Sequence, residues 1–458
     1  MRPLRVLGHR VSIPLLLLSL LEAVAAGVAV YAAIAFDAFG AVADSAPLSI
    51  PVFAAMSLMV LMSALGLYQL NLRATFVGIV VRTAIAFMAA LPLIGTLYII
   101  IPVEPPSMQA VAASAMVAFI TIALLHAVFF TCADAGLLKR RILVLGGGPG
   151  TQALAALRRS ADRRGFELVG HVPLDGEAGP GPSFIADRPL AEIARSVGAD
   201  EIVVSVADRR GRLPLEALMD CRYAGIGVVE MIDFIEREAG KVRVDLLRPG
   251  WMLFNTGETG RPGVFAKRAL DLVAGLLLLM VGLPFMMATA LAVKIEDGWR
   301  APVLYRQRRV GQGGTLFELV KFRSMRVDAE ADGRPRFAAT DDDRVTRVGR
   351  IIRKVRIDEL PQLFNVIRGD MSLVGPRPER PEFVAKLECE IPFYRERHRI
   401  KPGITGWAQL LYPYGATQQD MLEKTQYDLY YLKNRGLLLD LIILLQTVEV
   451  VVFGKGAR

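Results

Sequence analysis

Two adjacent carboxylates, Asp358 and Glu359, stand in the segment RIDELPQLFNVIRGDMSLVGPRPE. Pro361 suits the first turn of a helix, and the N-terminal end of a helix favours an ionised carboxylate. An ionised aspartate can attack phosphorus, and a neighbouring glutamate can hold Mg²⁺, which prefers oxygen ligands and phosphate groups. The pair therefore suggests phosphoryl transfer, although an isolated Asp-Glu pair is more often a helix cap on a surface.

Basic side chains near this pair are candidate ligands for phosphate. Lys321 and Arg323 lie in KFRSM, Arg353 precedes Asp358 by five residues, and Arg377 stands between two prolines in GPRPE. Arginine offers phosphate a planar fork and lysine a point charge. Each of these residues could instead be a solvated surface charge, but the flanking prolines restrict the backbone that carries Arg377.

The first 133 residues contain four long apolar blocks, VSIPLLLLSLLEAVAAGVAVYAAIAF, SIPVFAAMSLMVLMSALGLYQL, GIVVRTAIAFMAALPLIGTLYIII and QAVAASAMVAFITIALLHAVFFTCA. Each is near or above the roughly 20 residues that cross a bilayer, which predicts four transmembrane helices. The positive-inside rule places the N-terminus and everything after residue 139 in the cytoplasm. The loops assigned to the cytoplasm and their borders carry the basic residues Arg2, Arg5, Arg10, Arg73, Arg82, Lys139, Arg140 and Arg141. The other two loops contain no lysine or arginine, only the acidic residues Asp37, Asp44 and Glu104.

Residues 141–240 alternate short apolar runs with helical segments, which predicts a small parallel α/β sheet. The glycines of GGGPG, from Gly146 to Gly150, follow the first predicted strand, and such turns can admit a phosphate. The second strand lacks a well-placed acid for a ribose, and no tyrosine has a lysine four residues later. A structural Rossmann-like domain is therefore favoured over one that binds NAD or a regulatory nucleotide.

An apolar segment at residues 269–293 is long enough to span a bilayer, but Lys267, Arg268 and Lys294 flank it on both sides and Pro284 lies inside it. Basic flanks at both ends disfavour crossing, and a proline kinks a helix. The pattern favours a helix that enters the membrane and returns, with a fifth straight span as the alternative. The C-terminal segment GLLLDLIILLQTVEVVVFG carries charges and indicates a packed or interfacial helix.

From Lys267 onward the chain resembles the bacterial sugar transferases, which are polyprenyl-phosphate sugar-1-phosphate transferases. The resemblance covers residues 265–458 through ordered motifs, KRALDL, VLYRQRRVGQGGTLFELVKFRSM, DDDRVTRVGRIIRKVRIDELPQLFNVIRGDMSLVGPRPE, RHRIKPGITGWAQL and YDLYYLKN. With its N-terminal spans and α/β middle, the chain looks like the larger phosphoglycosyl transferases of the WbaP/WcaJ type. One departure is Arg356, where many relatives carry a small hydroxyl residue.

The resemblance implies that Asp358 is the nucleophile and that Glu359 supports Mg²⁺. It also implies a UDP-sugar donor, a polyprenyl phosphate acceptor, release of UMP, and the first step of exopolysaccharide or related glycan synthesis. The expected setting is the bacterial inner membrane, with the catalytic domain on the cytoplasmic face. The net charge of +9 fits anionic lipid heads and phosphorylated substrates, and no recognised motif points to nucleic acid.

Four regions are predicted. Residues 1–138 form a transmembrane helical bundle, 139–240 a Rossmann-like domain and 241–265 a linker. Residues 266–458 form a re-entrant membrane helix and a mixed, mainly helical catalytic domain. Two alternatives from other classes are a membrane-tethered nucleotide-sugar oxidoreductase that uses the glycine-rich turn, and a non-catalytic scaffold of a polysaccharide assembly complex. A homodimer is compatible with the sequence.

Overall fold

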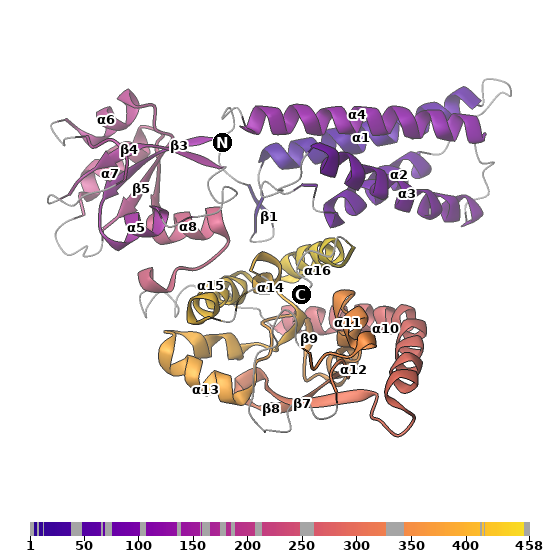
Figure 1. Cartoon of the computed structure of the whole chain (residues 1–458). Coiled ribbons are helices and arrows are strands. Elements are labelled where there is room, and N and C mark those ends of the chain that lie inside the picture. Colours follow the sequence, from indigo (N-terminus) through magenta and orange to yellow (C-terminus); the bar gives the residue numbers. More distant parts are fainter. Residues whose placement is uncertain are drawn as a thin grey trace. The chain divides into compact units, whose positions relative to one another are not determined.

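The computed structural model describes residues 4–6, 9–11, 13–37, 48–65, 67–68, 76–100, 107–134, 139–155, 157, 165–174, 180–184, 188–206, 213–247, 261–326, 343–412, 415 and 417–452. The chain divides into two compact units, Met1–Ala239 and Gly240–Arg458, which are coloured indigo to pink and pink to yellow in Figure 1.

Apolar helices form the first part of the N-terminal unit. They are α1 (Ile13–Asp37), α2 (Ser49–Ala64), α3 (Phe76–Ile100) and α4 (Met108–Asp134), preceded by the short antiparallel strands β1 (Leu4–Val6) and β2 (His9–Val11). Each helix packs on the next, and α4 packs on α1. Many large apolar side chains face outward, such as Val24, Met88 and Leu124. The predicted N-terminal apolar helices are confirmed, and their outward apolar surface suits surrounding lipid.

The second of these helices differs from the prediction. By length and apolar character α1, α3 and α4 can each cross a membrane, whereas α2 has 16 residues and extends only about 24 Å at 1.5 Å per residue. Arg82, counted above as a loop charge, is buried within α3 and donates from Nη1 to the carbonyl of Leu65, just beyond the end of α2 (3.0 Å). A cation at this position stabilises the C-terminal end of a helix.

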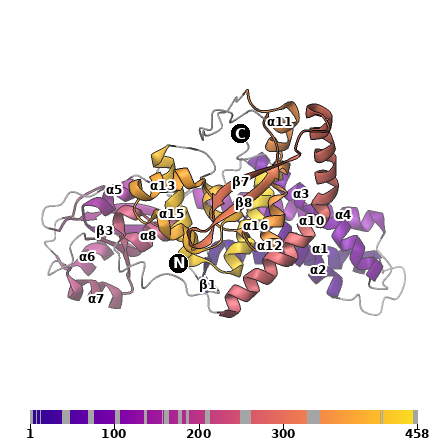
Figure 2. The ribbon, with the colours of Figure 1, turned by 90° about the horizontal axis from the view of Figure 1, so that it is seen from below.

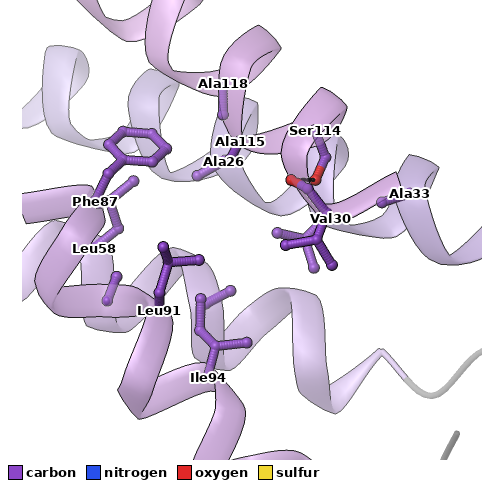
Figure 3. A pocket seen from close by; sticks show the side chains of 13 residues that line it. Ala26, Val30, Ala33, Leu58, Phe87, Leu91, Ile94, Ser114, Ala115 and Ala118 are labelled. Atoms are coloured by element: carbon purple, nitrogen blue, oxygen red, sulfur yellow. Dashed lines mark hydrogen bonds between the residues drawn. The ribbon is translucent and has the colours of Figure 1, made fainter. Parts of the chain in front are cut away.

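Two features inside the helical bundle were not foreseen. Glu22 is buried, accepts a hydrogen bond from Tyr68 Oη (2.8 Å) and lies 2.5 Å from His126 Nδ1, which ties α1 to α4. Residues of all four helices also line a small cavity of about 80 Å³, which Figure 3 shows from close by. Its lining is apolar apart from Ser114, whose hydroxyl is bonded to the carbonyl of Val111.

A parallel sheet of four strands completes the N-terminal unit. In chain order the elements are β3 (Arg140–Gly146), α5 (Pro149–Ala155), β4 (Phe166–Val172), α6 (Leu190–Ser196), β5 (Glu201–Ser205), α7 (Leu215–Tyr223), β6 (Gly227–Glu230) and α8 (Met231–Ala239). The strand order is β4-β3-β5-β6, and all pairs are parallel. The predicted α/β middle region is confirmed.

The glycine-rich turn after β3 is occupied by the chain itself. A Cβ on Gly150 would lie 2.4 Å from Ser205 Oγ, and this hydroxyl donates to the carbonyl of Gly147 (2.9 Å). Gly146 has a φ of 90°, a region that glycine enters without strain. These glycines are therefore explained by close packing of the turn against β5, which supports a structural role for it.

The C-terminal unit is mixed. It comprises η3 (Val244–Leu246), α10 (Arg261–Asp297), β7 (Leu304–Val310), η4 (Gln312–Gly314), β8 (Leu316–Phe322), α11 (Arg347–Lys354), η5 (Ile357–Glu359), α12 (Gln362–Arg368), β9 (Ser372–Val374), α13 (Pro381–Glu390), η6 (Tyr394–Arg399), β10 (Gly403–Thr405), α14 (Trp407–Leu411), α15 (Gln418–Asn434) and α16 (Leu437–Val452). Strands β7 and β8 form an antiparallel hairpin, and β9 pairs with β10 in parallel.

The core of this unit joins residues from distant parts of the chain, including Val242, Val366, Leu373, Leu429 and Ile443. One of these positions revises the sequence interpretation, and another decides between its two alternatives for the C-terminal helix. Val242 belongs to the stretch assigned above to a linker, but it is fully buried and its N–H donates to Gln426 O (3.0 Å). Ile443 lies on the buried face of α16, so this C-terminal helix is a packed helix. Residues 248–260 of the assigned linker lie outside the described residues.

Helix α10 has 37 residues, and its apolar stretch Gly263–Asp297 is long enough to cross a membrane. Its ribbon changes direction sharply in Figures 1 and 2, and Pro284 lies inside the helix. A proline removes one helical hydrogen bond and is a common cause of such bends.

Both ends of α10 are held by the same C-terminal unit. Near its start, Arg268 donates to the carbonyls of Val366 and Ile367 (2.7 Å each), and Asp271 accepts from Ser372 Oγ (2.9 Å). Lys267 also pairs with the buried Asp440 of α16 (2.7 Å). The KRALDL motif therefore anchors the helix to α12, β9 and α16.

At the other end of α10, Glu296 accepts the backbone N–H groups of Arg347 and Val348 (2.7 and 2.9 Å), at the start of α11. Asp297 pairs with Arg323, directly after β8 (2.7 Å). Because α10 is anchored at both ends, it places α11, η5 and α12 as one group beside the hairpin.

Candidate active site

Asp358 and Glu359 lie in the short turn η5, between α11 and α12. Arg356, just before them, has a left-handed backbone with a φ of 57°, which is uncommon for a residue with a side chain. This bend separates α11 from η5 and brings both acids in front of the β7–β8 hairpin, which contacts η5. Backbone conformations of this kind are concentrated at functional sites.

Burial is the main influence on Asp358. Burial, and after it the neighbouring Glu359, raise the pKa of this carboxyl from 3.8 to about 6 against the opposing effect of Lys321, Arg353 and Arg377. The expectation that a helix end holds Asp358 ionised is therefore incomplete, because burial outweighs the surrounding positive charge. At neutral pH the carboxyl is still mostly ionised, and it is less strongly solvated than an ordinary surface aspartate.

Lys321 reaches the same place from β8. Its Nζ lies 5.3 Å from the centre of the Tyr305 ring on β7. Burial, and after it the charge of Arg309, lower the pKa of Lys321 from 10.5 to about 8, although Asp358 and Glu359 act in the opposite direction. Lys321 is therefore mostly a cation at neutral pH and loses its proton at a pH slightly above neutral.

Arg377 approaches Glu359 from the GPRPE loop. Its Nη1 and Nη2 both lie 3.3 Å from Glu359 Oε1, and Nη1 also contacts Gln409 Oε1 at 3.2 Å. Among residues 371–379, Arg377 is the one with an exposed side chain. Glu359 is the largest cause of its raised pKa.

Three of the four predicted basic residues, Lys321, Arg353 and Arg377, lie around the predicted pair Asp358 and Glu359. The fourth, Arg323, is buried and paired with Asp297 at the end of α10. The structure thus gives Arg323 a structural partner, and its place in substrate binding stays a prediction.

Sequence reasoning missed Arg309 and Gln409. Arg309 lies on β7, and burial lowers its pKa to about 10. In β7, Tyr305, Gln307 and Arg309 are more buried than the residues between them. This two-residue alternation of a strand could have separated Arg309 from its exposed neighbours Arg306 and Arg308. For Gln409, which touches Arg377 from α14, the sequence held no comparable signal.

The carboxylate oxygens at the site are of the kind that Mg²⁺ prefers, although they are few. Asp358 and Glu359 provide carboxylate oxygens, but the described residues contain no cluster of three or more histidine, cysteine, aspartate or glutamate side chains suited to a metal. Mg²⁺ commonly binds through one or two carboxylates together with substrate phosphates and water. The residues present therefore suit an ion that arrives with a phosphorylated substrate.

Comparison with known proteins places these motifs in a family. The family model described as "Bacterial sugar transferase" matches residues 263–454. The chain is 43% identical over 243 residues to a UDP-N-acetylgalactosamine-undecaprenyl-phosphate N-acetylgalactosaminephosphotransferase of Aeromonas hydrophila, covering 53% of this chain and 56% of that protein. It is 33% identical over 343 residues to an undecaprenyl-phosphate glucose phosphotransferase of Komagataeibacter xylinus, covering 70% and 60%.

The chain thus spans less than two thirds of these two relatives. A UDP-glucose:undecaprenyl-phosphate glucose-1-phosphate transferase of Caulobacter vibrioides is covered more fully, with 42% identity over 205 residues, 44% of this chain and 73% of that protein. The likeness to this shorter relative includes most of its length. The chain belongs to the bacterial sugar transferase family.

Proposed function

We propose that this protein transfers a sugar 1-phosphate from a UDP-sugar to a polyprenyl phosphate, such as undecaprenyl phosphate, as the first step of an exopolysaccharide or related glycan. The observation that carries the proposal is the half-buried Asp358 with three cationic side chains around it. Family membership and the named activities of three relatives support the same reaction.

In the first step, the Asp358 carboxylate attacks the β-phosphorus of the UDP-sugar. The bond between this phosphorus and the oxygen that bridges to the α-phosphate breaks, and UMP leaves with that oxygen. The product is a mixed anhydride between the aspartyl carboxyl and the sugar phosphate. The raised pKa of Asp358 suits this role, because a poorly solvated carboxylate is a better nucleophile than a fully hydrated one.

In the second step, an oxygen of the polyprenyl phosphate attacks the same phosphorus. The bond from phosphorus to the aspartyl oxygen breaks, which regenerates the carboxylate and yields a polyprenyl-diphosphate-linked sugar. Both steps concentrate negative charge on phosphate oxygens. Lys321, Arg353 and Arg377 lie where they can offset that charge, as fixed cations do at phosphoryl-transfer sites.

We assign Mg²⁺ to the carboxylate of Glu359, with Asp358 beside it. When bound, the ion would neutralise phosphate charge and favour departure of UMP. The contact from Arg377 holds Glu359 Oε1 in place, so the protein itself orients the carboxylate toward the site.

We also propose that α10 is re-entrant and that the catalytic unit lies on the cytoplasmic face of the bacterial inner membrane. A straight helix of 37 residues would separate its ends by about 54 Å. Both ends instead bond to residues of the same compact unit, through Arg268 and Asp271 at one end and Glu296 and Asp297 at the other. A bent helix that returns to its starting side would bring the acceptor lipid to a site open to cytosolic UDP-sugars.

The test is UMP release by detergent-purified protein with Mg²⁺, undecaprenyl phosphate and a panel of UDP-sugars, with Asp358→Asn in parallel. The expected result is release that requires the lipid, prefers one sugar and disappears in the variant. Normal activity of Asp358→Asn would overturn the proposed mechanism. If no UDP-sugar supported release while the purified protein retained NAD(H), the oxidoreductase alternative would replace the proposal; no release and no nucleotide would favour a scaffold.

A further inference from the structure

The GPRPE loop, Gly375–Glu379, is fixed at every residue by a backbone contact. The contacts are Gly375 N to Thr405 O (2.9 Å), Gly403 N to Pro376 O (2.9 Å), Arg397 Nη2 to Arg377 O (3.1 Å), Arg309 Nη1 to Pro378 O (3.1 Å) and Val310 N to Glu379 O (3.0 Å). At Gly375 a Cβ would lie 2.4 Å from Lys401 O, so a side chain cannot be accommodated there. The loop is therefore a rigid support for its one exposed side chain, Arg377.

Two of these five contacts come from arginine side chains, and Arg397 is the more deeply buried of the two. Its side chain is 5% exposed, and its charge is met by the buried Asp428 of α15 at 2.8 Å from Nη2 and 3.0 Å from Nε. Its Nη1 donates to Tyr394 Oη (2.7 Å), and Nη2, besides facing Asp428, donates to the carbonyl of Arg377. One guanidinium thus connects α15 and η6 to the backbone of the residue that contacts Glu359.

We infer that Arg397, held by Asp428, is a positioning residue that sets the place of Arg377 over Glu359. The inference rests on the proposed function, because it assigns Arg397 no contact with substrate and lets it act only through Arg377. A buried ion pair is a weak source of stability compared with well-packed apolar residues. Its geometry here instead serves orientation, since the planar fork meets three acceptors in three directions.

Lysine cannot replace this arrangement. An ammonium group keeps the charge and can still pair with Asp428, but it lacks the fixed, spread donors of a guanidinium. We therefore expect Arg397→Lys to release the Arg377 carbonyl while keeping the buried charge balanced. Displacing an active-site group by about 1 Å can cost about 100-fold in rate.

The test is a double-mutant cycle on UMP release with the single variants Arg397→Lys and Arg377→Gln and the double variant. In the wild-type background, Arg397→Lys is expected to lower kcat by about 10- to 100-fold, with a smaller change in KM. In the Arg377→Gln background, the same change should cost less than about 2-fold, because residues that act through one another are not additive. Arg399→Lys is the matched control, since the exposed Arg399 pairs with Glu396 and should keep full activity.

Two results would overturn the inference. An equal fold-loss from Arg397→Lys in both backgrounds would show that Arg397 acts independently of Arg377, and a normal kcat would show that its contact is dispensable. If thermal unfolding shows that Arg397→Lys is not folded, Asp428→Asn replaces it in the same cycle. Failure of the proposed function looks different, because wild-type protein would then release no UMP.

Discussion

Arg377 donates to Glu359 from both terminal nitrogens, each 3.3 Å from the same carboxylate oxygen, Oε1. Glu359 Oε2 lies 3.8 Å from Arg356 Nη1. The proposed Mg²⁺ ligand is therefore already surrounded by positive charge. An arriving cation must share this carboxylate with two arginines, so these side chains influence both phosphate binding and metal affinity.

Removing one of these charges should have opposite effects on metal affinity and on turnover. We expect Arg377→Gln to lower the Mg²⁺ concentration for half-maximal UMP release, because a repelling cation beside Glu359 is gone. At saturating Mg²⁺, kcat should fall by about 10- to 1,000-fold, as when a donor to developing charge is lost. Mg²⁺ titrations of wild type and variant measure both effects. A half-saturating concentration that is unchanged or higher would argue against shared use of Glu359.

Asp358→Asn should abolish turnover and stabilise the fold. In the folded protein the pKa of Asp358 is raised from 3.8 to about 6, so the contribution of this carboxyl to stability becomes less unfavourable as pH falls from above 6 toward 3.8. At pH 7 the charged form is disfavoured by folding, and a neutral isostere should raise the free energy of unfolding by roughly 1–3 kcal/mol. Thermal unfolding in detergent at pH 7 measures this change.

The matched control for that experiment is Asp245→Asn. Asp245 is exposed and pairs with Arg243 at the surface of the same unit. This control should leave the melting temperature nearly unchanged. A lower melting temperature for Asp358→Asn would mean that Asp358 is a structural residue.

The pH dependence of kcat/KM should be bell-shaped. Below about 6 the Asp358 carboxyl gains a proton and cannot attack phosphorus; above about 8 Lys321 loses the charge that offsets the phosphate. Because Asp358 and Glu359 interact, the acid limb reports the pair. Initial rates of UMP release from pH 5 to 9.5 measure both limbs.

Lys321→Arg isolates the alkaline limb, because arginine stays protonated throughout this range. Its acid limb should remain near 6 while its alkaline limb moves up or vanishes. An alkaline limb that stays in place in Lys321→Arg would assign that limb to another group.

The two ends of α10 should be accessible from the same side of the membrane. Val264, near its start, and Trp299, just after its end, are both exposed. In a background where Cys132, Cys221 and Cys389 are replaced, Val264→Cys and Trp299→Cys should both react with a membrane-impermeant maleimide in inverted vesicles and neither in intact spheroplasts. Reaction of one cysteine in inverted vesicles and of the other in spheroplasts would show that α10 crosses the membrane as a straight span. Reaction of both cysteines in spheroplasts would place both ends of α10 on the periplasmic side.

Much of the architecture follows from the sequence because it depends on local periodicity. Long apolar blocks predict α1, α3 and α4, and alternating strand and helix runs predict the parallel sheet around β3. The same reasoning overestimated α2, which has only 16 residues. It also could not show that the buried Arg82 of α3 contacts the backbone at the end of α2. Contacts between helices cannot be read from one apolar block.

The acidic pair and four basic residues were candidates from residue type and spacing, since Asp358 and Glu359 are neighbours and Arg377 is framed by prolines. Their assembly was decided by the tertiary structure, which brings Lys321 from β8, Arg353 from α11 and Arg377 from a loop to one place. Arg323 follows Lys321 by two residues, so strand alternation would place both on one face. It lies beyond the end of β8 at Phe322, however, and turns to Asp297 instead.

The residues that hold the GPRPE loop in place could not be predicted from the sequence. Arg397 stands among several basic residues in RERHRIK, and nothing in that run distinguishes it from Arg395 or Arg399. It is distinguished only by its burial and by Asp428, which lies 31 residues away on α15. Residue type and local pattern therefore identified the residues that are candidates for phosphoryl transfer. Burial and long-range pairing, which exist only after folding, decided which charges take part and how they are held.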